Sequence, residues 1–137
     1  GFYIVRRNET WRKVYYELFE SVKNSTPTFA SIITYLYEYT GNIEPSFSSK
    51  MLATIQPEKP IWDRYVVQNL NIQLTGTTKE EKLKNAIMLY AEMEKWYAHF
   101  LETGKGKECI AEFDRVLPDY KGISQIKKID SILWSIR

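Results

Sequence analysis

The sequence predicts an all-α protein, a compact orthogonal bundle of about seven helices that forms one domain over residues 1–137. Apolar residues recur every three or four positions along most of the chain, which is the period of an amphipathic helix. Helix start and stop signals separate these stretches, and no stretch shows the strict alternation of a half-buried strand. A length of 137 residues suits a single hydrophobic core.

The first two predicted helices precede the middle of the chain. The first begins after a cap at Asn8 or Thr10. Its apolar face consists of Trp11, Val14, Tyr15, Leu18, Phe19 and Val22. The second begins at Thr26-Pro27, because threonine is a good N-cap and proline fits the first helical position. Gly41 ends it, since glycine readily takes the left-handed conformation that closes a helix.

The middle of the chain is its least regular part. Ser46 is expected to cap a short helix that continues to Ile55. Pro57 and Pro60 then impose an extended link, because proline fixes its own backbone and restricts the residue before it. A further short helix is predicted from about residue 61 to residue 70.

Three helices are predicted in the rest of the chain. Thr77 and Thr78 are each followed by a glutamate three positions later, which is the spacing of a capping box. The long helix that starts there is expected to stop at Gly104. A sixth helix ends at Pro118, and Ser124 caps a seventh.

The composition excludes several classes of protein and site. With 44% hydrophobic residues the chain is too apolar for a disordered tail, and its net charge of +2 does not by itself mark a nucleic-acid binder. The lone Cys109 and lone His99 cannot form an internal disulfide or a common zinc site, so we expect no metal, no cofactor and a reducing, cytoplasmic setting. The chain has no apolar run on the order of 18 residues, so no membrane contact is expected. It begins with Gly1, which leaves room for residues upstream, and its oligomeric state stays open.

A cluster of hydroxyls and a lysine marks the start of the short central helix. Ser46, Ser48 and Ser49 precede Lys50 there. The free N–H groups and the positive dipole end at a helix start favour anions. We therefore expect these four residues to bind a phosphate, either of a nucleic acid or of a small ligand, or a carboxylate of the protein itself.

Asp63 is the second candidate, and two interpretations of it remain open. It is expected in the first turn of the next helix, on the apolar side with Val66, where a carboxylate is costly unless it is bonded. Its simplest partner is either the donor-rich start of the preceding helix or the N-terminus of its own helix. In one interpretation Asp63 and Lys50 are fold staples that tie two helix starts together. In the other they are catalytic residues of a pocket, where a neutral Lys50 amine acts as a nucleophile and Asp63 stabilises a developing cation.

Two aromatic residues flank Asp63. The chain contains 20 aromatic residues, and most of them fall on the apolar faces of the predicted helices. Trp62 and Tyr65 are among the few that do not. Exposed rings of this kind can stack on nucleobases, so we expect Trp62 and Tyr65 to line the pocket.

The two segments resemble the helix-hairpin-helix superfamily of base-excision DNA glycosylases. Pro45 and Lys50 match the Pro and Lys of its Leu-Pro-Gly-Val-Gly-Arg-Lys hairpin, and Asp63 matches the Asp of its Val-Asp-Thr-His-Val segment. The resemblance implies that Lys50 attacks the sugar, that Asp63 assists, and that the helix start holds a DNA phosphate. Ser46 and Ser48 replace the hairpin glycines, and only 13 positions (63 − 50) separate the Lys from the Asp, so catalysis is left open.

The chain also resembles a group of uncharacterised bacterial all-helical proteins. They share a Ser-Lys…Lys-Pro-Ile-Trp-Asp block, here residues 49–63, and a Lys-Lys-Ile-Asp…Leu-Trp ending, here residues 127–134. This second resemblance implies no activity. The leading prediction is a nucleic-acid-associated helical domain with DNA as its partner. The alternatives are a non-enzymatic protein-interaction or structural module, and an enzyme that acts on a small phosphorylated ligand.

Overall fold

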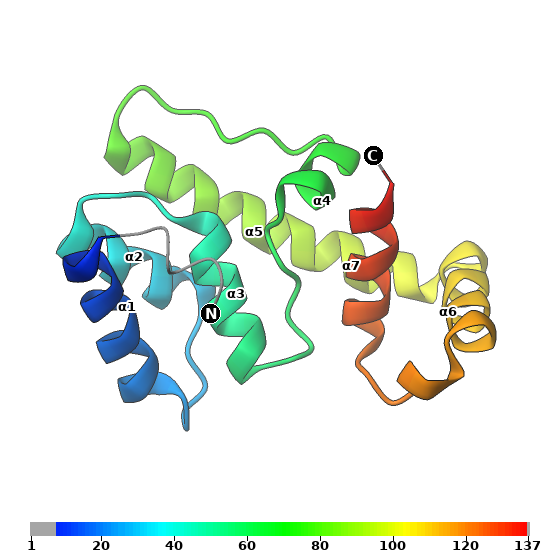
Figure 1. Ribbon diagram of the computed structural model, residues 1–137. Coiled ribbons are helices and arrows are strands. Elements are labelled where there is room, and N and C mark those ends of the chain that lie inside the picture. Colours follow the sequence, from blue (N-terminus) through cyan, green and yellow to red (C-terminus); the bar gives the residue numbers. More distant parts are fainter. Residues whose placement is uncertain (1–7, 137) are drawn as a thin grey trace.

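The predicted all-α class is confirmed by the computed structural model, which describes residues 8–136 (Figure 1). The expectation about residues upstream of Gly1 lies outside the described residues. Within them there are seven α-helices, one 3₁₀ helix and no strand. The elements are α1 (Glu9–Val22), α2 (Phe29–Thr40), α3 (Pro45–Ile55), α4 (Arg64–Asn69), α5 (Lys79–Glu102), α6 (Gly104–Val116), η2 (Pro118–Tyr120) and α7 (Gln125–Ser135).

Several helix boundaries lie where the sequence predicts them. The side-chain oxygens of Asn8, Thr78 and Ser124 accept the N-capping hydrogen bonds of α1, α5 and α7. Gly41 ends α2 with a left-handed φ of 77°. Polar capping residues therefore place these helices without help from distant contacts.

Four predicted boundaries were wrong, and one of them is the start of α4, which lies at Arg64 and not at about residue 61. The cap of α2 is Thr28 and not Thr26, because Thr28 forms a reciprocal capping box within the first turn. Ser46 does not cap α3, since that helix begins one residue earlier with Pro45 in the first position. Gly104 begins α6 directly after the Thr103 cap. The nearby Gly106 is required at this corner, because a Cβ there would lie 1.9 Å from the carbonyl oxygen of Phe100.

The helices form two groups joined by α5 (Figure 1). Helix α2 packs against α1, α3 and α5, while α7 packs against α4, α5 and α6. The longest helix, α5, thus contacts both groups. Its buried residues include Tyr90 and Tyr97, and Phe29 of α2 stacks on Tyr90 with ring centroids 4.0 Å apart.

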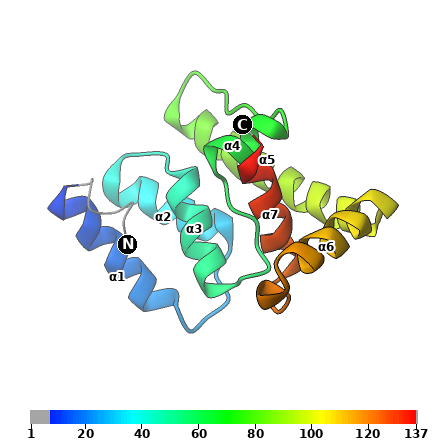
Figure 2. The ribbon, with the colours of Figure 1, turned by 45° about the vertical axis from the view of Figure 1, so that its right-hand side comes forward.

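The segment of residues 56–63 runs between α3 and α7 (Figure 2). Side chains from α5 and from the start of α7 hold its carbonyl groups. The Tyr90 hydroxyl donates to the carbonyl oxygen of Pro60 at 2.7 Å. The Ser124 hydroxyl donates to that of Pro57 at 2.8 Å. These bonds fix the extended course that the prolines favour.

Two N–H groups of the same segment are held in a similar way. The N–H of Ile61 donates to Asp130 of α7 at 3.1 Å. The N–H of Trp62 donates to Ser49 Oγ of α3 at 2.7 Å, and this bond is buried. Because the segment has no secondary-structure partner, these side chains satisfy backbone groups that would otherwise be orphaned. The segment is therefore held in place between α3 and α7.

Candidate functional site

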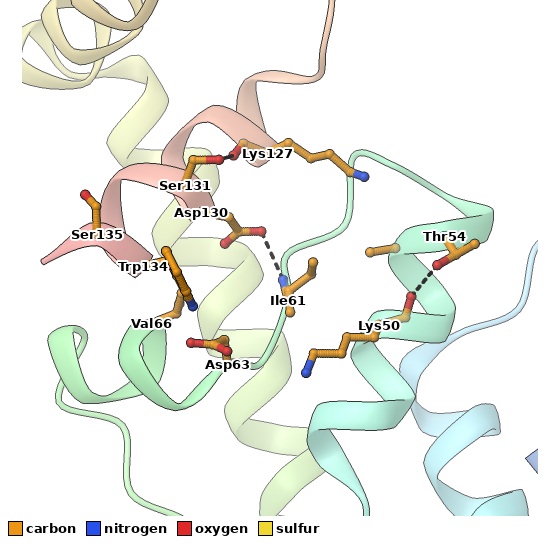
Figure 3. Close-up of a pocket in the computed structure, with 11 residues that line it drawn as sticks. Lys50, Thr54, Ile61, Asp63, Val66, Lys127, Asp130, Ser131, Trp134 and Ser135 are labelled. Carbon is orange, nitrogen blue, oxygen red and sulfur yellow. Dashed lines mark hydrogen bonds between the residues drawn. The ribbon is translucent and has the colours of Figure 1, made fainter. Parts of the chain in front are cut away.

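A groove of about 660 Å³ opens between α3 and α7 (Figure 3). Its walls are α3 and α7, residues of the 56–63 segment lie between them, and the start of α4 closes one side. Eleven residues line it: Lys50, Ala53, Thr54, Ile61, Asp63, Val66, Lys127, Asp130, Ser131, Trp134 and Ser135. The groove thus brings two lysines and two aspartates together with a largely apolar surface.

Lys50 and Lys127 come from opposite walls of the groove. Burial lowers the pKa of the Lys50 ammonium, and the nearby Asp63 carboxylate partly opposes this change. At a given pH a larger share of this amine is therefore neutral than in an exposed lysine. The pair can offer cationic donors to an anion, and Lys50 can in addition act as a nucleophile.

Asp63 is the N-cap of α4. The prediction that it lies inside the first turn of the helix is therefore wrong by one position. Its backbone is extended, and its Oδ1 accepts a hydrogen bond from the N–H of Tyr65 at 2.9 Å. The capping role explains why a half-buried carboxylate is tolerated here. In the structure of residues 8–136 no hydrogen bond reaches the other carboxylate oxygen of Asp63.

Asp130 is the second carboxylate of the groove and is 8% exposed. It accepts hydrogen bonds from the Tyr97 hydroxyl and from the N–H of Ile61. Burial raises the pKa of Asp130 to about 6, although both hydrogen bonds oppose this rise. The charge at this end of the groove therefore changes in a pH range close to neutrality.

The predicted phosphate-binding cluster at the start of α3 is not formed. Ser48 and Ser49 are both 0% exposed, so a phosphate in solvent cannot reach either hydroxyl. Ser46 is half-buried and does not line the groove. Of the four predicted residues, only Lys50 faces the groove.

The two aromatic residues predicted to line the pocket, Trp62 and Tyr65, do not line the groove, whereas Trp134 does. Trp62 is 7% exposed, lies in the core with its ring parallel to that of Phe29, and does not line the groove. Tyr65 does not line the groove either, and its ring contacts the edge of Trp134 at a centroid distance of 6.1 Å. Trp134 lines the groove and is 46% exposed. Its indole is therefore the ring that a ligand could stack on.

The sequence analysis missed the contribution of α7 to this groove. Lys127, Asp130, Ser131 and Trp134 follow the spacing i, i+3, i+4, i+7 and therefore share one helix face. That pattern was visible in the sequence. The apolar residues of the same helix define its buried side, and sequence alone does not distinguish a groove wall from a solvated face on the opposite side.

The described residues offer neither an obvious metal site nor a membrane span. In residues 8–136 no group of three or more His, Cys, Asp or Glu side chains is placed to hold a metal ion. Over the same range, none of the helices has both the length and the apolar character needed to cross a membrane. No protein-family model matches the chain, and no curated protein or solved structure is detectably similar to it. The resemblance to DNA glycosylases therefore stays a prediction.

Proposed function

We propose that the protein binds DNA through the groove between α3 and α7, with one nucleotide inside the groove. The observation that carries this proposal is that Lys50 and Asp63, which belong to separate elements, line the same groove. The DNA-binding residues of the proposal are therefore Lys50 and Asp63, the two residues to which the resemblance gives catalytic roles. The helix start at Ser46 and Ser48 has no part in it.

The size and chemistry of the groove support a nucleotide as its ligand. A volume of about 660 Å³ lies within the range of small-ligand sites. The exposed indole of Trp134 offers a surface for base stacking, next to the apolar side chains of Ile61 and Val66. Lys50 and Lys127 on the opposite walls suit the phosphates on either side of the bound nucleotide.

A binding titration at low salt tests this proposal. Fluorescence anisotropy of a labelled single-stranded oligonucleotide is measured with the wild type, with Lys50→Met and with Lys105→Ala. Methionine keeps the apolar stem of Lys50, and Lys105 is an exposed residue of α6 outside the groove. We expect Lys50→Met to weaken binding and to reduce the salt dependence by about one ion, while Lys105→Ala leaves both nearly unchanged. If both variants weaken binding equally, the interaction depends on the overall surface charge and not on the groove.

Catalysis needs a separate experiment. The neutral amine of Lys50 would attack the aldehyde carbon of an abasic site and form a C–N bond. With one proton taken up from solvent, the aldehyde oxygen leaves as water, and Asp63 stabilises the resulting iminium cation. Borohydride reduces such an iminium to a stable covalent adduct. An adduct with an abasic-site duplex that disappears in Lys50→Met would establish this chemistry. Without an adduct the protein is a DNA-binding module and not a lyase.

A second candidate function is protein interaction. It is favoured by three apolar side chains that are exposed close together in sequence at the end of α6 and in η2, namely Val116, Leu117 and Tyr120. Under this alternative Lys50 and Asp63 have only structural roles. The anisotropy titration separates the two functions, because an interaction module shows no DNA binding at any salt concentration.

A further inference from the structure

We propose that the groove selects an unpaired base with an amino group at the C4 position of a pyrimidine or the C6 position of a purine, that is cytosine or adenine, and that Asp63 is the residue that recognises it. This inference rests on the proposed DNA binding and names the class of nucleotide. Its basis is the geometry of the Asp63 carboxylate within the groove.

The capping bond of Asp63 fixes one half of its carboxylate. Oδ1 is held at 2.9 Å from the N–H of Tyr65, at the start of α4. A side chain that is bonded in this way keeps its orientation before a ligand arrives. Oδ2 takes no hydrogen bond within residues 8–136, and the residue lines the groove (Figure 3). The protein thus presents a fixed acceptor to the ligand.

The other polar side chains around the groove do not offer an equivalent acceptor. Both oxygens of Asp130 are already bonded, one to Tyr97 and one to Ile61. Lys50 and Lys127 only donate hydrogen bonds, and they suit phosphates. The hydroxyls of Thr54, Ser131 and Ser135 also line the groove, and each donates to a backbone carbonyl of its own helix. Their neutral oxygens are weaker acceptors than a carboxylate, so Asp63 is the strongest available acceptor that a base edge would meet.

The base edges differ in what they offer to such an acceptor. Cytosine and adenine carry an amino group, which donates N–H to a carboxylate. Thymine and guanine carry a carbonyl oxygen at the corresponding position, and its lone pairs face the carboxylate unfavourably. The base must be unpaired, because in a duplex its pairing edge is occupied by the partner base.

Three single-stranded oligonucleotides of about 12 nucleotides test the inference, namely oligo(dA), oligo(dC) and oligo(dT). Anisotropy titrations at low salt give their affinities for the wild type and for Asp63→Asn. Asparagine caps a helix as well as aspartate does, so α4 is kept while the carboxylate is lost. We expect the wild type to bind oligo(dC) and oligo(dA) about ten-fold more tightly than oligo(dT). In Asp63→Asn this preference should disappear, because the amide oxygen keeps the capping bond and the amide NH2, which only donates, replaces the acceptor that faces the groove.

Asp63→Ser is the second variant, since serine also caps helices but carries no carboxylate. Far-ultraviolet circular dichroism establishes that each variant is folded. Equal affinities of the wild type for the three strands would overturn the inference but leave DNA binding intact. A preference for oligo(dC) and oligo(dA) that persists in both variants would also overturn the inference and leave DNA binding intact. If the wild type binds none of the strands, the proposed function fails as well.

Discussion

The side chain of Asp63 serves both the fold and the proposed site. One carboxylate oxygen caps α4, and the residue also lines the groove. Of the two partners predicted for the Asp63 carboxylate, the N-terminus of its own helix is confirmed. No hydrogen bond within residues 8–136 joins Asp63 to the start of α3, so the predicted staple between two helix starts is not formed. Asp63 holds its own helix, whereas the link between the 56–63 segment and α3 is made by Ser49.

The capping role leads to a stability prediction. Asp63→Ala should lower the free energy of unfolding by about 1 kcal/mol, because the N–H of Tyr65 loses its acceptor. Asp63→Asn should change the free energy of unfolding by only about 0.3 kcal/mol, because asparagine keeps the capping bond. Urea unfolding of both variants measures the difference. Equal losses would mean that charge, and not capping, is what matters at this position.

Asp130 leads to a prediction about pH. Its pKa is about 6 in the folded protein, above the ordinary value of 3.8, so folding favours its protonated form. Its contribution to stability is therefore present at low pH and is lost as the pH rises through about 6. Relative to Asp130→Asn, the wild type should gain about 1.4 kcal/mol of unfolding free energy between pH 7.5 and pH 5.

Urea unfolding of the two proteins at a series of pH values checks this. The comparison with Asp130→Asn removes the contributions of other groups, such as Glu81, whose lowered pKa acts in the opposite direction at lower pH. A difference that stays constant over this range would show that Asp130 titrates at its ordinary pKa.

Among the elements, the 56–63 segment depends most on single side chains. It has no helical or strand partner, and side chains from α3, α5 and α7 bind its backbone. The two neighbouring serines of α3 allow a matched test of this account. Ser49 accepts the N–H of Trp62, whereas within residues 8–136 the equally buried Ser48 hydroxyl has no hydrogen-bond partner.

Ser49→Ala should lower the free energy of unfolding by about 2 kcal/mol, because it leaves the buried N–H of Trp62 unsatisfied. Ser48→Ala should be nearly neutral or slightly stabilising, since it removes a buried hydroxyl that has no partner. Thermal and urea unfolding of both variants measure the contrast. The account of the segment is wrong if the two substitutions cost the same.

Local signals allowed most elements to be predicted, but not the groove. Caps such as Asn8, Thr78 and Ser124 act within one turn, so the sequence reveals them directly. The contact between Ile61 and Asp130 joins positions 69 residues apart, and no local pattern specifies it. The orientation of Trp62 likewise depends on its packing against Phe29, which is set by the tertiary fold.

At the scale of the whole molecule, the groove requires both helix groups. One wall belongs to α3, which packs on α2, and the other belongs to α7, which packs on α4, α5 and α6. Because α5 contacts both groups, a substitution that disturbs its packing should affect the groove as well as the core. The central claim is that DNA occupies this groove and no other surface of the molecule.

The four tryptophans give a direct measurement of that claim. Trp134 lines the groove, whereas Trp11 and Trp62 are buried in the core and Trp96 stacks on Phe100. In ¹H–¹⁵N spectra each indole N–H gives its own signal, and Trp134→Phe assigns the one from the groove. We predict that adding oligo(dC) shifts the Trp134 indole signal and leaves the other three in place. DNA binding that leaves the Trp134 signal unmoved would contradict the account.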